Sequence, residues 1–144
     1  MRSTGTLETQ LYARQFVDTI KARNRARIVA LHGDLGSGKT TFAQGVASVL
    51  GIERAVQSPT YVIEKIYDTK HVAFKKMIHI DAYRLEKSEE LVKLGWEDII
   101  SDPRNIILVE WPERVADIMP DNADIIRFEF IDETTRDIEI EYGR

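Results

Sequence analysis

One segment near the N-terminus places apolar residues three and four positions apart, the spacing of a helix with one buried face, and two later segments carry the start or stop signals of helices. The first runs from Leu11 through Phe16 to Ile20 and is expected to end near Asn24. Gly51 closes the second, because glycine is common just after the last helical residue. The predicted helices cover residues 11–24, 40–50 and 88–95.

Other segments are short and rich in β-branched residues, or alternate apolar with charged positions, and both patterns are typical of strands. RIVALH (27–32) and NIILVE (105–110) are compact apolar runs, as expected for buried strands. The two C-terminal segments alternate instead, which predicts a hairpin with one face in water. The predicted strands cover residues 27–32, 61–67, 72–81, 105–110, 125–131 and 138–142.

The order of these elements predicts an α/β fold with a central sheet flanked by helices. The sheet is expected to be mixed, because the short hairpins at 61–81 and 125–142 require antiparallel pairing. The strands at 27–32 and 105–110 are expected to be parallel and central. With no repeat or linker in the sequence, residues 1–144 are predicted to form one domain.

Composition narrows the possible chemistry. The chain has no cysteine and three histidines, which excludes disulfides, a thiolate zinc site and a cysteine nucleophile. Short apolar runs and a polar N-terminus predict a soluble, cytoplasmic protein without a membrane span or signal peptide. Residues 1–77 carry a net charge of +6 and residues 78–144 a net charge of −10. The basic half suits a phosphate-bearing ligand, although a solvated surface explains the segregation equally well.

One motif identifies that ligand more specifically. GDLGSGKT (33–40) satisfies G-x-x-x-x-G-K-[ST], a pattern expected by chance in roughly one chain in 200 of this length. Its position after a buried strand and before a helix is the context in which such a loop wraps a nucleotide phosphate. Lys39 is expected to reach the β- and γ-phosphates, and the Thr40 hydroxyl to ligate Mg²⁺. The predicted fold is therefore P-loop NTPase-like.

Two predicted strands end in an acid, Asp81 and Glu110. In open α/β sheets ligands bind beyond the carboxyl ends of the parallel strands, so Glu110 is well placed, and an acid there can hold Mg²⁺ or orient water. Polar residues end many strands, and only the neighbouring phosphate loop favours a functional interpretation. A further candidate is Thr60, in the segment SPTY (58–61), which resembles a loop that senses the γ-phosphate through Mg²⁺. An ordinary turn is the alternative.

The motifs together resemble the TsaE family, small bacterial P-loop ATPases needed for threonylcarbamoyladenosine synthesis on tRNA. The resemblance is carried, in order, by GDLGSGKTTFAQG (33–45), SPTY (58–61), HIDAYRLE (79–86), ELVKLGWED (90–98) and VEWPER (109–114). It implies that ATP and Mg²⁺ are the cofactors and that a TsaB–TsaD complex, the partner of this chain, performs the transfer. It also implies that tRNA contacts the chain only indirectly or transiently.

The resemblance assigns roles to matching positions. Thr40 and Glu110 match the Mg²⁺-associated residues, and Asp81 matches the acid linked to hydrolysis. Lys39, Asp81 and Glu110 are therefore the candidate catalytic residues. The candidate ATP-binding residues are Gly33, Asp34, Leu35, Gly36, Ser37, Gly38, Lys39, Thr40, Thr41 and Thr60, with Thr6 and Thr135 for the adenine.

Two further motifs receive an interpretation from the family. Ser58, Pro59 and Thr60 match its switch-like loop. Trp111, Glu113 and Arg114 complete a W-P-E-R motif, in which the tryptophan equally suits simple packing. His32 and His79 lie in or beside predicted strands, where a histidine that packs in the core or at its rim is more common than a catalytic one.

Other nucleotide-dependent functions fit parts of the pattern. A small-molecule or nucleoside kinase would use the same loop, but such enzymes usually carry an arginine-rich lid, and the sequence has no evident one. A GTP-dependent switch ordinarily contains N-K-x-D and D-x-x-G, and neither occurs. A nucleotide sensor without catalysis has the same motifs as a slow ATPase, so both interpretations stay open.

Overall fold

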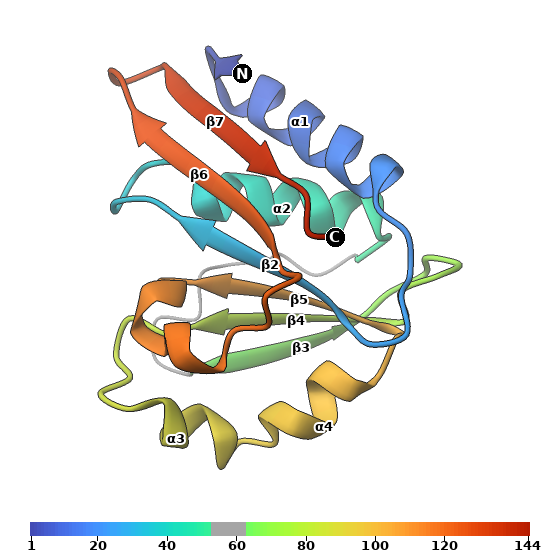
Figure 1. The fold of residues 1–144 in the computed structure, drawn as a ribbon. Coiled ribbons are helices and arrows are strands. Elements are labelled where there is room, and N and C mark those ends of the chain that lie inside the picture. The colour runs from blue at the N-terminus through green and yellow to red at the C-terminus, as the bar shows by residue number, and fades with distance from the viewer. Residues whose placement is uncertain (53–62) are drawn as a thin grey trace.

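The computed structural model describes residues 1–52 and 63–144, which contain a seven-stranded sheet in the order β1-β7-β6-β2-β5-β4-β3 (Figure 1). The predicted segment SPTY (58–61) lies outside the described residues. The strands are β1 (Arg2–Ser3), β2 (Arg27–His32), β3 (Glu64–Asp68), β4 (Lys76–Asp81), β5 (Asn105–Glu110), β6 (Asp124–Phe130) and β7 (Arg136–Glu141).

The sheet is mixed, as predicted. β2 pairs in parallel with both β5 and β6, and β4 pairs in parallel with β5. The hairpins β3–β4 and β6–β7 are antiparallel, and β1 adds antiparallel to β7. β2 and β5 are therefore parallel strands inside the sheet, and their carboxyl ends lie together at one edge.

Helices cover both faces of the sheet (Figure 1). α1 (Thr6–Thr19) and α2 (Lys39–Val49) pack on one face, over a core that includes Val29 and Leu31 of β2. The opposite core contains Ile28 of the same strand. It is covered by α3 (Ser88–Val92), α4 (Trp96–Ser101) and the 3₁₀ helix η1 (Pro112–Ile118). Alternate residues of one strand thus serve two cores, which explains its continuous apolar sequence.

Several predicted boundaries are wrong. The first helix ends at Thr19 and not near Asn24, because Ile20 is already extended while its N–H still bonds to the carbonyl of Phe16. β4 begins at Lys76 and not at residue 72. Before it, the ring of His71 accepts the backbone N–H groups of Ala73 and Phe74, and this turn replaces the start of the predicted strand.

Three elements were not predicted from the sequence: β1, α4 and η1. The helix predicted to end at Gly95 already ends at Val92, and the left-handed backbone of Gly95 (φ 90°) starts α4 instead. The buried Trp96 and Ile100 hold this six-residue helix against the sheet. Elements this short carry too few periodic positions to be recognised without their tertiary contacts.

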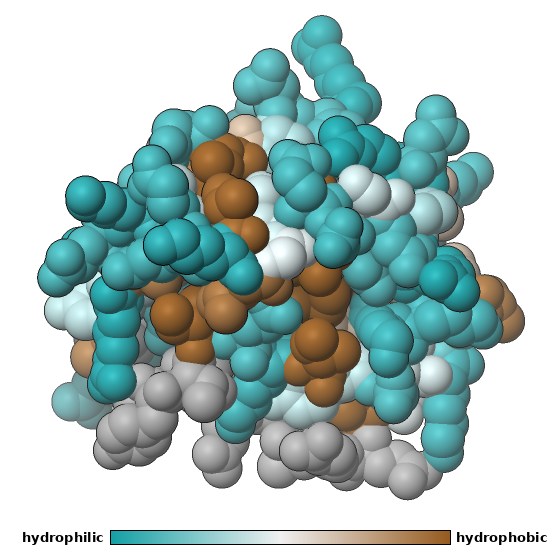
Figure 2. Space-filling model, turned by 90° about the horizontal axis from the view of Figure 1, so that it is seen from below, coloured by the Kyte–Doolittle hydropathy of each residue, from teal (hydrophilic) through white to brown (hydrophobic). Residues whose placement is uncertain are grey.

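The face of the molecule that carries α3 and α4 is mostly hydrophilic, and its apolar side chains gather in small separate groups (Figure 2). Val92 and Leu94 are among the exposed apolar residues of this region. Within the described residues, no helix has both the length and the apolar character needed to cross a membrane.

The contact between α1 and α2 depends on Gly45. A methyl group at this position would lie 2.7 Å from Cβ of Ala13 and 3.0 Å from Cα of Gln10. We expect Gly45→Ala to destabilise the fold by about 1–2 kcal/mol, because overpacking costs more than the roughly 1 kcal/mol of helix propensity gained. Urea unfolding measures the difference, and a variant as stable as the parent protein would contradict this close helix contact.

Candidate functional site

The loop between β2 and α2 has the backbone that its glycines permit. Gly36 (φ 76°) and Gly38 (φ 108°) adopt left-handed conformations, and Gly38 directly precedes the first turn of α2. A side chain at Gly33 is excluded by space, since a Cβ there would lie 2.5 Å from Oγ of Ser37 and 2.9 Å from the carbonyl oxygen of Phe128. The loop thus presents compact backbone at the N-terminus of a helix, where anions bind.

Ser37 adds an unusual feature to this loop. Its side chain is buried, and its Oγ has no hydrogen-bond partner among the described residues. A buried hydroxyl without a partner is costly, because it has given up its hydrogen bonds to water. An unpaired hydroxyl next to a close-packed glycine backbone suits a loop that binds a polar, anionic ligand.

Lys39 points its ammonium group toward the centre of the site. The side chain is 4% exposed, and Nζ donates a hydrogen bond to the carbonyl of Gly33 at 2.5 Å. Nζ also lies 3.9 Å from the centre of the Trp111 ring. Burial lowers the pKa of Lys39, and the carboxylates of Glu110 and Glu113 partly oppose this effect. A cation with so little contact with water favours an anionic partner.

Asp81 and Glu110 lie side by side at the carboxyl ends of β4 and β5, where they are direct partners in the parallel register. Burial raises the pKa of Asp81, while a hydrogen bond from the backbone N–H of Tyr83 to Oδ1, at 3.0 Å, opposes the shift. Oε2 of Glu110 lies 2.6 Å from Nε2 of His79. The two acids thus share one edge of the sheet but have different surroundings.

The W-P-E-R segment forms the next part of the site. Trp111 is in the left-handed region (φ 59°), which turns the chain from β5 into η1. Its ring lies 5.1 Å from that of Tyr83, over which the guanidinium of Arg114 lies at 5.4 Å. Glu113 contacts Nδ1 of His32 at 3.2 Å. Trp111 therefore contacts the phosphate-loop lysine and also packs against the core under α3 and α4.

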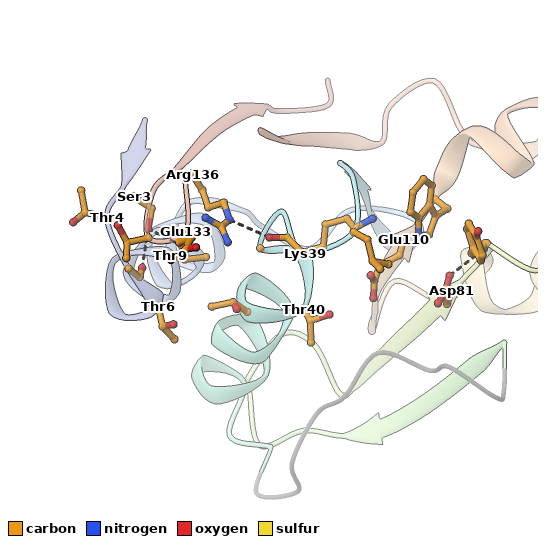
Figure 3. Close-up of a pocket in the computed structure, with 18 of the residues that line it drawn as sticks. Ser3, Thr4, Thr6, Thr9, Lys39, Thr40, Asp81, Glu110, Glu133 and Arg136 are labelled. Carbon is orange, nitrogen blue, oxygen red and sulfur yellow. Dashed lines mark hydrogen bonds between the residues drawn. The ribbon is translucent and has the colours of Figure 1, made fainter. Parts of the chain in front are cut away.

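A pocket of about 600 Å³ joins these groups to the N-terminal segment and to the turn between β6 and β7 (Figure 3). Predicted residues that line it are Thr6, Leu35, Gly36, Gly38, Lys39, Thr40, Thr41, Asp81 and Glu110. Gly33, Asp34 and Ser37 lie in the same loop, but they do not line the pocket, and neither does Thr135, although Thr134 and Arg136 do. Thr60 is outside the described residues.

Several residues of the pocket had no assigned role in the sequence. Arg136 donates from Nε to the carbonyl of Gly36 at 3.1 Å, and its guanidinium lies 4.5 Å from the ring centre of Phe130. No local motif marks this arginine, which reaches the phosphate loop only through the hairpin. Tyr83, whose ring lies beside Trp111, belongs to the HIDAYRLE motif, and this membership was the sequence feature from which a role in the site could have been predicted.

Few side chains of the described residues could bind a metal ion. No cluster of three or more histidine, aspartate or glutamate side chains suited to a metal ion occurs in residues 1–52 and 63–144. Thr40 and Glu110 both line the pocket. A hydroxyl and a carboxylate suit Mg²⁺ when phosphate oxygens and water complete its coordination, as is usual for this ion.

The sheet is mixed, its central strands are parallel, and a glycine-rich loop joins the central strand β2 to a helix. Together with the acids at the ends of the neighbouring strands, these features define a P-loop protein of the α/β class. Over residues 4–138 the sequence matches the family described as "Threonylcarbamoyl adenosine biosynthesis protein TsaE". The chain belongs to this family, which takes part in the biosynthesis of threonylcarbamoyladenosine on tRNA.

Individual proteins show the same relationship. The chain is 34% identical over 130 residues to a tRNA threonylcarbamoyladenosine biosynthesis protein TsaE of Rickettsia bellii, covering 90% of this chain and 85% of that protein. It is 36% identical over 116 residues to the TsaE protein of Haemophilus influenzae, covering 81% and 70%. The crystal structure of Bacillus subtilis YdiB superposes with a TM-score of 0.80 at 28% identity, covering 100% of this chain and 84% of that one.

Proposed function

We propose that this chain binds ATP with Mg²⁺ and hydrolyses it in support of threonylcarbamoyladenosine synthesis. The observation that carries the proposal is the position of Lys39, a nearly buried ammonium group in a pocket that two strand-end acids also line. A triphosphate would supply the negative charge that balances this lysine. The helix N-terminus and the glycine-rich backbone would then bind its phosphate oxygens.

Each residue has a separate task in this proposal. The loop backbone and Lys39 bind the β- and γ-phosphates, and Thr40 and Glu110 hold Mg²⁺. The ion neutralises charge on the phosphates when it is bound. Asp81, at the end of the adjacent strand, orients the attacking water. Thr6, at the start of α1, lines the far part of the pocket, which is open to the adenosine.

We infer that the threonylcarbamoyl transfer itself is performed by a TsaB–TsaD complex to which this chain binds in the cytoplasm, and that tRNA contacts the chain only indirectly or transiently. The family membership supports the pathway. The rim of the pocket supports a protein partner, because Leu35 and Tyr83 line it and are 87% and 51% exposed. A surface that covers these side chains would also exclude water from the phosphates.

We therefore expect the isolated chain to hydrolyse ATP slowly and the TsaB–TsaD complex to change the rate tenfold or more. A tenfold change in rate corresponds to about 1.4 kcal/mol in activation free energy. Phosphate release is measured for the chain alone, with each partner, and with both. Affinity for the complex is measured with ATP and with ADP, because a coupled partner must distinguish the two nucleotide states.

Two results would contradict this proposal. If the partners leave the rate of phosphate release unchanged, and the nucleotide leaves the affinity for the complex unchanged, the chain is a stand-alone enzyme. Transfer of labelled phosphate to a small-molecule or nucleoside acceptor, in place of its release, would identify a kinase. The matched control is Lys93→Ala, an exposed lysine at the end of α3 that is not among the pocket residues.

A further inference from the structure

His79 is a buried histidine next to the proposed magnesium residue. Its side chain is 0% exposed, and its Nε2 lies 2.6 Å from Oε2 of Glu110, which is itself 3% exposed. The pair bridges two neighbouring parallel strands, in which His79 faces Leu108 and Asp81 faces Glu110. Because strand residues alternate, His79 and Glu110 lie on the same face of the sheet, beneath α2.

The environment of the ring indicates which atom carries the proton. Nδ1 is also buried and has no hydrogen-bond partner among the described residues. Among the described residues no acceptor faces Nδ1, so a proton on this atom would be buried without a hydrogen-bond partner. A neutral ring with its proton on Nε2 leaves Nδ1 as an acceptor only, which costs less, and donates its single N–H to the carboxylate.

His79 places a hydrogen-bond donor within reach of the buried Glu110 carboxylate. A carboxylate taken out of water needs hydrogen-bond partners to replace those it had in solvent, and it must keep one rotamer to act at a fixed point. Carboxylates that bind metal ions are typically held by such outer hydrogen bonds, and loss of these bonds weakens metal affinity. Glu110 also lines the pocket, so the hydrogen bond and the ligand site belong to one side chain.

We propose that His79 is a positioning residue that donates from Nε2 to Glu110 and holds this carboxylate in one orientation for Mg²⁺–nucleotide. The inference rests on the proposed function, and it adds a role for a residue whose sequence pattern indicated only a core histidine. In this role the first residue of the HIDAYRLE motif, in β4, orients the acid at the end of β5 and takes no part in the reaction itself.

The test compares variants that keep or remove the donor. His79→Gln keeps an N–H group near the position of Nε2, whereas His79→Leu removes it and His79→Asn places its amide too close to the backbone to reach Oε2. We expect His79→Leu and His79→Asn to raise the Mg²⁺ concentration required for half-maximal binding of a non-hydrolysable ATP analogue by about tenfold. His79→Gln is expected to recover most of this loss.

A matched variant separates positioning from stability. Met77 is buried two residues earlier on the same face of β4. Met77→Ala is expected to lower the melting temperature while leaving the Mg²⁺ requirement unchanged. Since Gln, Leu and Asn also alter packing at position 79, melting temperatures of all four variants accompany the binding data, and only a change specific to the loss of the donor supports the proposal.

A second measurement needs neither nucleotide nor activity. In the ¹⁵N spectrum of the ligand-free chain, the His79 ring is expected to carry one proton, on Nε2, and Glu110→Gln is expected to shift that signal. A proton on Nδ1 alone would overturn the hydrogen bond as assigned.

The possible results distinguish a failure of the proposed function from a failure of the positioning role of His79. If the parent chain shows no Mg²⁺-dependent binding of the analogue, the proposed function fails, and the role of His79 fails with it. If the parent chain binds as expected and His79→Leu and His79→Asn have the same Mg²⁺ requirement, the positioning role alone is overturned. An equal loss in His79→Gln and His79→Leu would likewise overturn it, because the donor would then be irrelevant.

Discussion

Replacement of Lys39 by alanine is expected to lower ATP hydrolysis by a factor on the order of 10²–10³ or more. Nζ is a cation within the phosphate loop, and phosphoryl transfer depends chiefly on positioning and charge neutralisation. The fold is expected to survive, because Lys39 is the first residue of α2 and alanine is the best helix former. Phosphate release at saturating Mg²⁺ measures the effect, with circular dichroism as the check on the fold.

The same variant also tests the contacts of Lys39 in this structure. The ammonium group bonds to the carbonyl of Gly33 and lies over the ring of Trp111. Loss of these contacts alone would alter stability and leave catalysis intact. A Lys39→Ala protein with parental turnover would therefore reject the phosphate-loop assignment, whatever its melting temperature. Lys93→Ala is expected to behave as the parent in both measurements.

Local sequence was enough to predict the elements that form the base of the site. β2 and β5 were recognisable as buried strands because residues facing both cores make a continuous apolar run. The start of α2 was recognisable because the glycines and Lys39 follow one another in a motif with a single structural context. The place of Glu110 in the pocket followed from the rule that ligands lie beyond the carboxyl ends of parallel strands, whereas its pairing with Asp81 became known only from the register of β4 against β5.

Contacts between segments far apart in the sequence could not be predicted from such local patterns. Arg136 reaches the carbonyl of Gly36 across 100 residues of sequence, and no periodicity or motif relates the two. His79 read as an ordinary strand histidine until the register of β4 against β5 placed its ring next to Glu110. The end of α1 depends on packing, since apolar spacing continued past Thr19 while the backbone became extended at Ile20. In each case a tertiary contact determines what the local pattern leaves open.

The two strand-end acids are expected to differ in what their loss does to the magnesium requirement. Glu110→Gln removes a charged ligand and should raise the Mg²⁺ concentration for half-maximal activity by about 10–100-fold. A smaller effect is expected on the rate once Mg²⁺ saturates. The measurement is a Mg²⁺ titration of phosphate release at fixed ATP, repeated with Mn²⁺ to test for a ligand role at the ion.

Asp81→Asn is expected to show the opposite balance. If the carboxylate orients and activates water, the rate should fall by about 10²–10⁴-fold, while the Mg²⁺ concentration required should change much less.

The pH dependence of the activity gives an independent signature of this role. Because burial raises the pKa of Asp81, its ionised form is lost on acidification at a higher pH than for an ordinary aspartate. Activity that needs this carboxylate should therefore fall as the pH drops through that raised pKa, and the fall should disappear in Asp81→Asn. Identical Mg²⁺ titrations and pH profiles for both variants and the parent would refute the division of roles, because two acids in direct register would then be interchangeable despite their different surroundings.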